Sequence, residues 1–283
     1  MPRRVKLTLE YDGTDFHGWQ VQNRGAPGSA PAGSVRTVQG EVERVLALLA
    51  GTPVRITGAG RTDEGAHALG QVASFDWPSA AEVPVAQLAA ALNANLPADL
   101  SAVSAEEMPA DFHAQVSAQG KHYRYRIFNR HARPALALRT HWHVRFPLQL
   151  EPMRKAAGLL LGRHDFAAFA TTLAEIQEKR SAEGKTALST VREIRRLEVL
   201  EPGPEAGGLH TEGATAAGRE LAIEVEGSGF LYKMVRTIAG SLVEVGRGKH
   251  PPEWIGTVLA AQDRRLAGPT APAKGICLVR VFY

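Results

Sequence analysis

Hydrophobic and polar residues in the first part of the chain follow patterns that predict strands separated by two helices. From Val5 to Tyr11 apolar and polar residues alternate, as expected for a half-buried strand. A helix is predicted after Thr37, a good N-cap residue, because apolar residues then recur at helical spacing until Gly51. A second helix is predicted to start at Pro84. Three shorter runs are predicted as strands: Val54 to Thr57, Gln71 to Trp77 and Leu100 to Ala105.

The rest of the chain shows a related order of strands and helices. The predicted strands are Lys121 to Phe128, Leu136 to Val144, Val191 to Leu200, Glu220 to Glu226 and Ile276 to Tyr283. The predicted helices are Pro152 to Leu161, Phe230 to Val245 and Pro252 to Ala261. No regular structure is assigned to three segments: Arg24 to Ser34, Leu173 to Lys185 and Glu201 to Gly218. This pattern predicts an α+β fold of two ferredoxin-like (RRM-like) halves with largely antiparallel sheets, residues 1–108 and 109–283.

The segment from Gly58 to Ala68 lies between two predicted strands and has little with which to build a core. Its glycines resemble a dinucleotide fingerprint, but Asp63 replaces the third glycine and a strand pattern follows where a helix is required. Residues i and i+2 of an extended segment project to the same side, so Arg61 and Asp63 are expected to face one cleft. The alternative for Asp63 is an Asx turn that caps Gly65.

Composition is that of a globular protein, with 44% hydrophobic and 22% charged residues. No apolar stretch approaches the ~20 residues of a membrane helix, and no signal-peptide pattern follows the basic N-terminus. The single cysteine, Cys277, excludes an intrachain disulfide and suits a reducing cytoplasm. His141 and His143 have strand spacing for a metal site, but without a clear third ligand a packed or phosphate-contacting pair is favoured.

The net charge of +4 is unevenly distributed. Between Phe112 and His164 there are ten basic residues and six histidines, against one acidic residue, Glu151. Aromatic residues lie among them, such as Tyr123 and Tyr125. A solvated charged face is one interpretation of such a run. The excess of arginine favours RNA instead, because guanidinium groups bind phosphate and stack on bases.

Six motifs occur in this chain in the order found in the TruA-type tRNA pseudouridine synthases, which it resembles over nearly its whole length. They are Tyr11-Asp-Gly-Thr-x-Phe-x-Gly-Trp-Gln20, Thr37-Val-Gln-Gly40, Gly60-Arg-Thr-Asp-x-Gly-x-His-Ala68, Lys121-x-Tyr-x-Tyr125, Phe230-Leu-x-x-Met-Val-Arg-x-Ile-x-Gly240 and Ala271-Pro-Ala-x-Gly275. The resemblance implies the pseudouridine synthase fold, with two α+β halves flanking a basic cleft. It also implies isomerisation of uridine to pseudouridine at positions 38, 39 and 40 in the anticodon arm of tRNA. A cytoplasmic homodimer that uses no metal and no organic cofactor is expected.

The resemblance also implies roles for individual residues. Asp63 matches the catalytic aspartate and is expected to be the nucleophile. Whether it attacks C1′, attacks C6 or removes a sugar proton is left open. Arg236 matches the basic partner that holds this carboxylate ionised. Tyr123 matches the tyrosine that stacks on the uracil and is a candidate base, although Tyr125 could be the ordinary strand aromatic beside it.

Three further residues are assigned to substrate binding in the same way. Arg61 would occupy the space of the flipped nucleotide or bind its phosphate. Ile276 would form an apolar wall against the ring, and His67 would support the loop or contact phosphate. A rival hypothesis is a non-catalytic RNA-binding protein, which explains the basic span but leaves the Arg61–Asp63 loop without a purpose.

Overall fold

The computed structural model describes residues 2–21, 35–202 and 218–283. The chain forms two compact units, residues 1–121 with 277–283, and residues 122–276. The sequence predicted a division after residue 108. The units divide later because the segment after residue 108 is tied to the first unit, where the backbone N–H of Ala114 donates to Ser74 Oγ at 3.0 Å. The predicted segment Arg24 to Ser34 lies outside the described residues.

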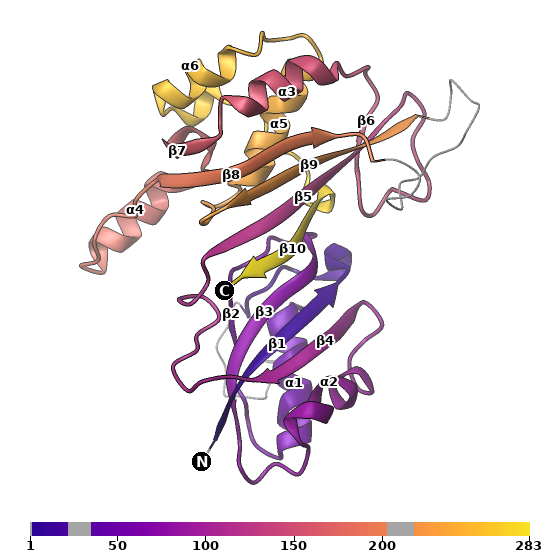
Figure 1. Cartoon of the computed structure of the whole chain (residues 1–283), viewed down its shortest axis with the longest axis vertical. Coiled ribbons are helices and arrows are strands. Elements are labelled where there is room, and N and C mark those ends of the chain that lie inside the picture. The colour runs from indigo at the N-terminus through magenta and orange to yellow at the C-terminus, as the bar shows by residue number, and fades with distance from the viewer. Residues whose placement is uncertain (1, 22–34, 203–217) are drawn as a thin grey trace. The chain divides into compact units, whose positions relative to one another are not determined.

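The first unit is built on a sheet in the order β4-β1-β3-β10 (Figure 1). Its strands are β1 (Arg3–Tyr11), β3 (His67–Trp77), β4 (Leu100–Glu107) and β10 (Ile276–Phe282), with the short β2 (Thr57–Gly58) paired to β3. β1 runs antiparallel to β3 and β4, whereas β10 runs parallel to β3 with Cys277 opposite His67. The two helices beside this sheet are α1 (Val38–Ala50) and α2 (Val85–Asn93), which contact each other.

Local sequence signals explain these elements. Alternate residues of β1, Val5, Leu7 and Leu9, are fully buried, as the period-two pattern predicted. Thr37 caps α1, since its Oγ1 accepts a hydrogen bond from Gly40 N at 3.2 Å. Gly51 ends α1 with φ of 67°, a left-handed conformation that glycine adopts without steric cost.

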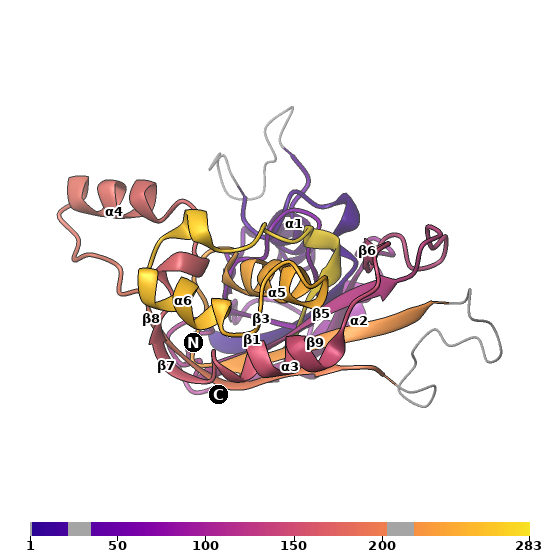
Figure 2. The same cartoon turned by 90° about the horizontal axis from the view of Figure 1, so that it is seen from above.

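The second unit has a sheet in the order β5-β9-β8-β7 with β6 parallel to β5. Its strands are β5 (Gly120–Asn129), β6 (Trp142–Val144), β7 (Gly162–Asp165), β8 (Val191–Leu200) and β9 (Arg219–Gly227). Its helices are α3 (Leu150–Gly158), α4 (Leu173–Ala182), α5 (Met234–Gly246) and α6 (Trp254–Ala261). Figures 1 and 2 show α4 apart from α3, α5 and α6, which lie together. The predicted α+β class with largely antiparallel pairing is confirmed.

Three predicted elements of the second unit differ from the structure. The strand expected from Leu136 is reduced to β6, because turns that include a bond from His141 N to Ala137 O occupy the preceding residues. The segment from Leu173, left unassigned for its polarity, forms α4. The helix expected from Phe230 begins at Met234, since Lys233 has φ of 58° and interrupts the helical geometry.

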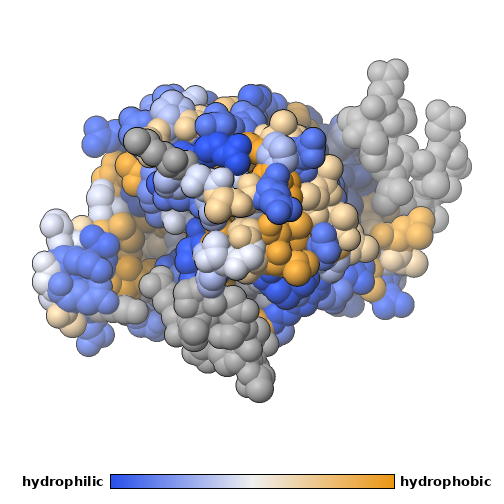
Figure 3. Space-filling view, turned by 90° about the horizontal axis from the view of Figure 1, so that it is seen from below, coloured by the Kyte–Doolittle hydropathy of each residue, from blue (hydrophilic) through white to orange (hydrophobic). Residues whose placement is uncertain are grey.

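Short 3₁₀ turns complete the described structure: η1 (Gly13–Asp15), η2 (Ala167–Phe169), η4 (Arg264–Leu266) and η5 (Ala273–Gly275). Among the described residues, no helix has the length and apolarity required to cross a membrane. The face shown in Figure 3 is mixed, with hydrophilic residues around a central group of hydrophobic ones.

Candidate active site

The loop that follows β2 is anchored through Thr62. This residue is buried, whereas Arg61 and Glu64 are exposed and Asp63 is half-buried. Thr62 Oγ1 lies 2.9 Å from Tyr11 Oη in a buried hydrogen bond, and its carbonyl accepts from Trp19 N at 3.1 Å. The hydrogen bonds of Thr62 therefore fix the backbone between Arg61 and Asp63, while both of these side chains stay accessible.

A tight turn holds the residues that follow Asp63. The Asp63 carbonyl accepts from Ala66 N at 3.1 Å, and Gly65 N donates to Phe16 O at 3.3 Å. Gly65 has φ of 75°, so the turn needs a residue that tolerates the left-handed region. The turn fixes the backbone of Asp63 from its C-terminal side.

His67 joins the end of this loop to the turn after β1. It is only 8% exposed, and its Nδ1 accepts a hydrogen bond from Gly13 N at 3.1 Å. Gly13 approaches the loop so closely that a Cβ there would lie 1.9 Å from Ala66 O. His67 thus lies between the loop and the turn after β1, and its role in substrate binding stays a prediction.

Three of the six motifs thus meet in the first unit. The segment Tyr11–Gln20 contacts the loop, and it also binds the start of α1 through Val38 N to Gly18 O (3.2 Å) and Gln39 N to Trp19 O (3.0 Å). The indole of Trp19 occupies the space where a Cβ on Gly58 would lie. The motifs around Asp63 therefore act as a brace that presents one carboxylate and one guanidinium from a rigid support.

The other three motifs meet in the second unit, apart from Lys121, which belongs to the first. The ring of Tyr123 packs edge-on against Phe230, with centroids 5.1 Å apart. Tyr125 is fully buried and donates its hydroxyl proton to Pro272 O at 2.8 Å. Burial raises the pKa of Tyr125 well above its ordinary value, against the opposing charge of Arg236. Tyr125 therefore stays neutral as a structural donor, whereas Tyr123 is only half-buried.

Arg236 is fixed on α5 by the segment that precedes β10. Its Nε donates to Ala271 O at 2.8 Å, and Ala271 N donates to the Arg236 carbonyl at 3.1 Å. Gly240, one turn further along α5, allows this approach, because a Cβ there would lie 1.8 Å from Pro269 O. Ile276, the first residue of β10, is 8% exposed.

The predicted site residues are therefore found in two groups. Arg61, Asp63 and His67 lie on one loop of the first unit. Tyr123, Arg236 and Ile276 belong to the second unit, where contacts with the other motif residues position the first two.

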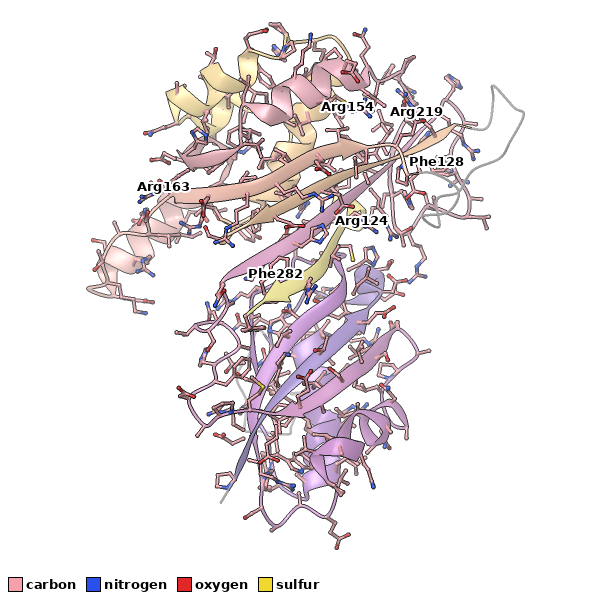
Figure 4. The ribbon with its side chains drawn as sticks, viewed as in Figure 1. Arg124, Phe128, Arg154, Arg163, Arg219 and Phe282 are labelled. Atoms are coloured by element: carbon pink, nitrogen blue, oxygen red, sulfur yellow. The ribbon has the colours of Figure 1, made fainter. Side chains whose placement is uncertain are left out.

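Of the ten basic residues of the middle segment, Lys121 belongs to the first unit and the other nine are distributed over the second. Figure 4 shows Arg124, Arg154 and Arg163 on β5, α3 and β7. Arg124 Nε lies 2.5 Å from Glu224 Oε1, and Arg154 pairs with Glu151 at 2.5 Å. Part of the predicted basic stripe is thus neutralised by carboxylates, one of which comes from β9.

Glu224 also shows how the fold controls these charges. It is 3% exposed and lies 2.5 Å from His122 Nε2 as well as from Arg124. Burial raises the pKa of this carboxyl, but the hydrogen bonds from His122 and Arg124 outweigh it, so the pKa is lowered overall. Glu224 therefore stays ionised beneath the two basic side chains.

The two candidate metal-binding histidines have separate partners. His141 Nε2 lies 3.0 Å from Glu220 Oε1, and His143 Nε2 lies 2.8 Å from Arg130 O. Within residues 2–21, 35–202 and 218–283 no group of three or more His, Cys, Asp or Glu side chains is arranged to hold a metal ion. The structure gives the pair packing and hydrogen-bonding contacts.

Sequence reasoning missed Gln71 as a part of the site. This residue is 0% exposed, and its Nε2 donates to Gly60 O at 2.9 Å. Its own Oε1 accepts from Val72 N at 3.1 Å. The signal was a polar residue within a strand that is buried on both faces, where a side chain must find a specific partner.

Comparisons with known proteins show which family the chain resembles. The family model described as "tRNA pseudouridine synthase" matches residues 8–115 and 156–283. The chain is 44% identical to a "tRNA pseudouridine synthase A" of Myxococcus xanthus, over 100% of this chain and 92% of the relative. It is 43% identical to the protein of that name from Syntrophotalea carbinolica (99% and 96%) and 42% identical to that from Geobacillus kaustophilus (100% and 95%).

Proposed function

The chain belongs to the tRNA pseudouridine synthases, isomerases that act on tRNA. We therefore propose that it converts uridines 38, 39 and 40 of the tRNA anticodon arm to pseudouridine. The reaction breaks the bond from N1 to C1′ and forms a bond from C5 to C1′. C5 loses a proton and N1 gains one, so no oxidant or reductant is consumed. The base must leave its stack to rotate, which requires a flipped nucleotide.

Asp63 is the proposed nucleophile. The observation that supports this most is the braced loop, in which buried Thr62 and the turn to Ala66 fix the backbone on both sides of a half-buried carboxylate. A nucleophile held in this way loses little conformational entropy when the substrate binds. Its fixed orientation therefore lowers the activation barrier. Attack at C1′, attack at C6 and proton abstraction all begin from the same ionised carboxylate.

The remaining roles are proposed together. Arg236 is the ion-pair partner of Asp63, and its bond to Ala271 O supports a fixed guanidinium. Tyr123 stacks on the uracil and is the candidate base, held at its edge by Phe230. Arg61 takes the place of the flipped nucleotide or binds its phosphate, and Ile276 supplies an apolar wall. We propose that the active form is a homodimer that works in the cytoplasm. Sedimentation of the purified protein tests for the dimer.

Asp63→Asn tests the chemistry, with Glu64→Gln as the matched control. Both variants convert a carboxylate to an amide of the same size, and Glu64 is the adjacent exposed residue. The substrates are tRNA transcripts that carry a single uridine at position 38, 39 or 40, and pseudouridine is measured after digestion. We expect no product from Asp63→Asn, with tRNA binding retained, and normal turnover from Glu64→Gln. Appreciable turnover by Asp63→Asn would sink the nucleophile assignment.

A further inference from the structure

Lys121 meets the loop of the proposed nucleophile from an element far along the chain. It is the second residue of β5, and within the first unit its ammonium lies against the Cα of Gly60. A Cβ on Gly60 would lie 2.4 Å from Lys121 Nζ and 3.4 Å from its Cε. The Gly60 carbonyl is held by Gln71 at 2.9 Å. The ammonium of Lys121 is thus placed beside the backbone of Gly60, whose carbonyl is hydrogen-bonded, directly before Arg61.

The charge of Lys121 is not compensated in the described part of the chain. No hydrogen bond or ion pair of its ammonium occurs among residues 2–21, 35–202 and 218–283. Burial lowers the pKa of this ammonium. Lys121 is half-buried, and a partly desolvated cation without an acceptor is stabilised when a ligand supplies an anion.

The substrate carries an anion at every nucleotide. Gly60 has no side chain to separate the ammonium from an approaching backbone, and Arg61 is exposed at the next position. Ammonium groups bind phosphate as point charges, and contacts of this kind fix the register of a nucleic acid on a protein. The glycine and the two basic residues together fit a phosphate near the nucleotide that is presented to Asp63.

The geometry points to Lys121 as a substrate-binding residue, whose ammonium contacts a backbone phosphate of the bound RNA beside the loop of Asp63. This inference rests on the proposed function, because it takes tRNA as the ligand. It differs from a packing role, in which Lys121 would only support Gly60. A phosphate contact contributes to the salt dependence of binding, whereas a packing contact does not.

Equilibrium binding of tRNA is the test, measured in the Asp63→Asn background so that no turnover disturbs it. Lys121→Met and Lys121→Gln remove the charge at similar length, and two variants guard against a folding defect in one. Lys185→Met is the matched control, since Lys185 is exposed and paired with Glu183 at 2.7 Å. Affinity is recorded over a series of salt concentrations, and thermal midpoints confirm that each variant is folded.

We expect both Lys121 variants to bind tRNA about 10-fold more weakly at low salt, the effect of one charge-assisted hydrogen bond. The slope of log affinity against log salt should fall by about 0.7–0.9, the contribution of one phosphate. Lys185→Met should leave the slope unchanged. An unchanged slope in folded Lys121 variants overturns the inference. Absence of pseudouridine from tRNA treated with the unmodified protein overturns the proposed function instead, so the two failures are distinguishable.

Discussion

Gly13→Ala is a sharp test of the brace around Asp63, although residue 13 takes no part in the chemistry. Its φ lies outside the left-handed region, so alanine is allowed by the backbone. The conflict is spatial, because the new Cβ would lie 1.9 Å from Ala66 O. Ala66 closes the turn on the Asp63 carbonyl, and Gly13 N also donates to His67. The substitution therefore pushes on the loop from the side that holds it.

The size of the effect follows from that distance. A Cβ essentially never approaches another heavy atom to less than 3.0 Å, so Gly13 and Ala66 must separate by at least about 1 Å. Overpacking of this kind costs about 1–3 kcal/mol of unfolding free energy. A displacement of ~1 Å in a catalytic group costs ~100-fold in rate. We expect turnover to fall by about two orders of magnitude, while the fold and tRNA binding persist.

The assay is single-turnover pseudouridine formation with excess enzyme, which isolates the chemical step from product release. Gly256→Ala is the matched control, because this glycine lies inside α6 and a Cβ there meets nothing within 4 Å. That variant should gain up to ~1 kcal/mol and keep its rate. If Gly13→Ala turns over within about threefold of Gly256→Ala, the brace does not position Asp63.

Two further predictions concern other supports. Gly240→Ala places a Cβ 1.8 Å from Pro269 O, so the segment that binds Arg236 must move. We expect the free energy of unfolding in denaturant to fall by about 1–3 kcal/mol and turnover to decrease. Wild-type stability and rate would contradict this. Asp99→Asn should lower the thermal midpoint near pH 7, since hydrogen bonds of 2.7 and 2.6 Å from Arg36 lower the pKa of Asp99 in the folded state. This stabilisation is present above the ordinary pKa of 3.8 and is lost as the pH falls through the folded value. A difference from wild type that persists unchanged in strong acid would refute it, and Asp76→Asn, at an exposed carboxyl, is the control.

Local signals in the sequence were enough to predict most elements. The alternation before Tyr11 gave β1, and the N-cap Thr37 with Gly51 gave both ends of α1. These succeeded because the determining contacts lie within a few residues along the chain. The left-handed conformation of Lys233 was not predicted, because no residue near it in the sequence favours a positive φ at a lysine.

Contacts between distant segments could not be predicted in this way. The motif that carries Asp63 was found from its residues, but its dependence on Gly13 is a consequence of β1 pairing with β3. The pairing of charged side chains was the property that the sequence predicted least well. The segment that contains Arg124 has almost no acidic residues, yet β9 lies next to β5 and supplies Glu224 about a hundred positions later. A count of charged residues within one segment does not include a carboxylate that a neighbouring strand supplies.

The parallel pairing of β10 with β3 has a consequence for how the protein is made. Cys277 and Leu278 lie opposite His67 and Ala68, the residues at which the Asp63 loop enters its strand. A ribosome adds about 5–20 residues each second and releases the chain in order. The second unit can therefore fold while the sheet of the first still lacks the strand that pairs with β3. The loop becomes fully supported only after residues 277–283 emerge, so a nascent chain that stops short carries the Asp63 loop without the strand that pairs beside it.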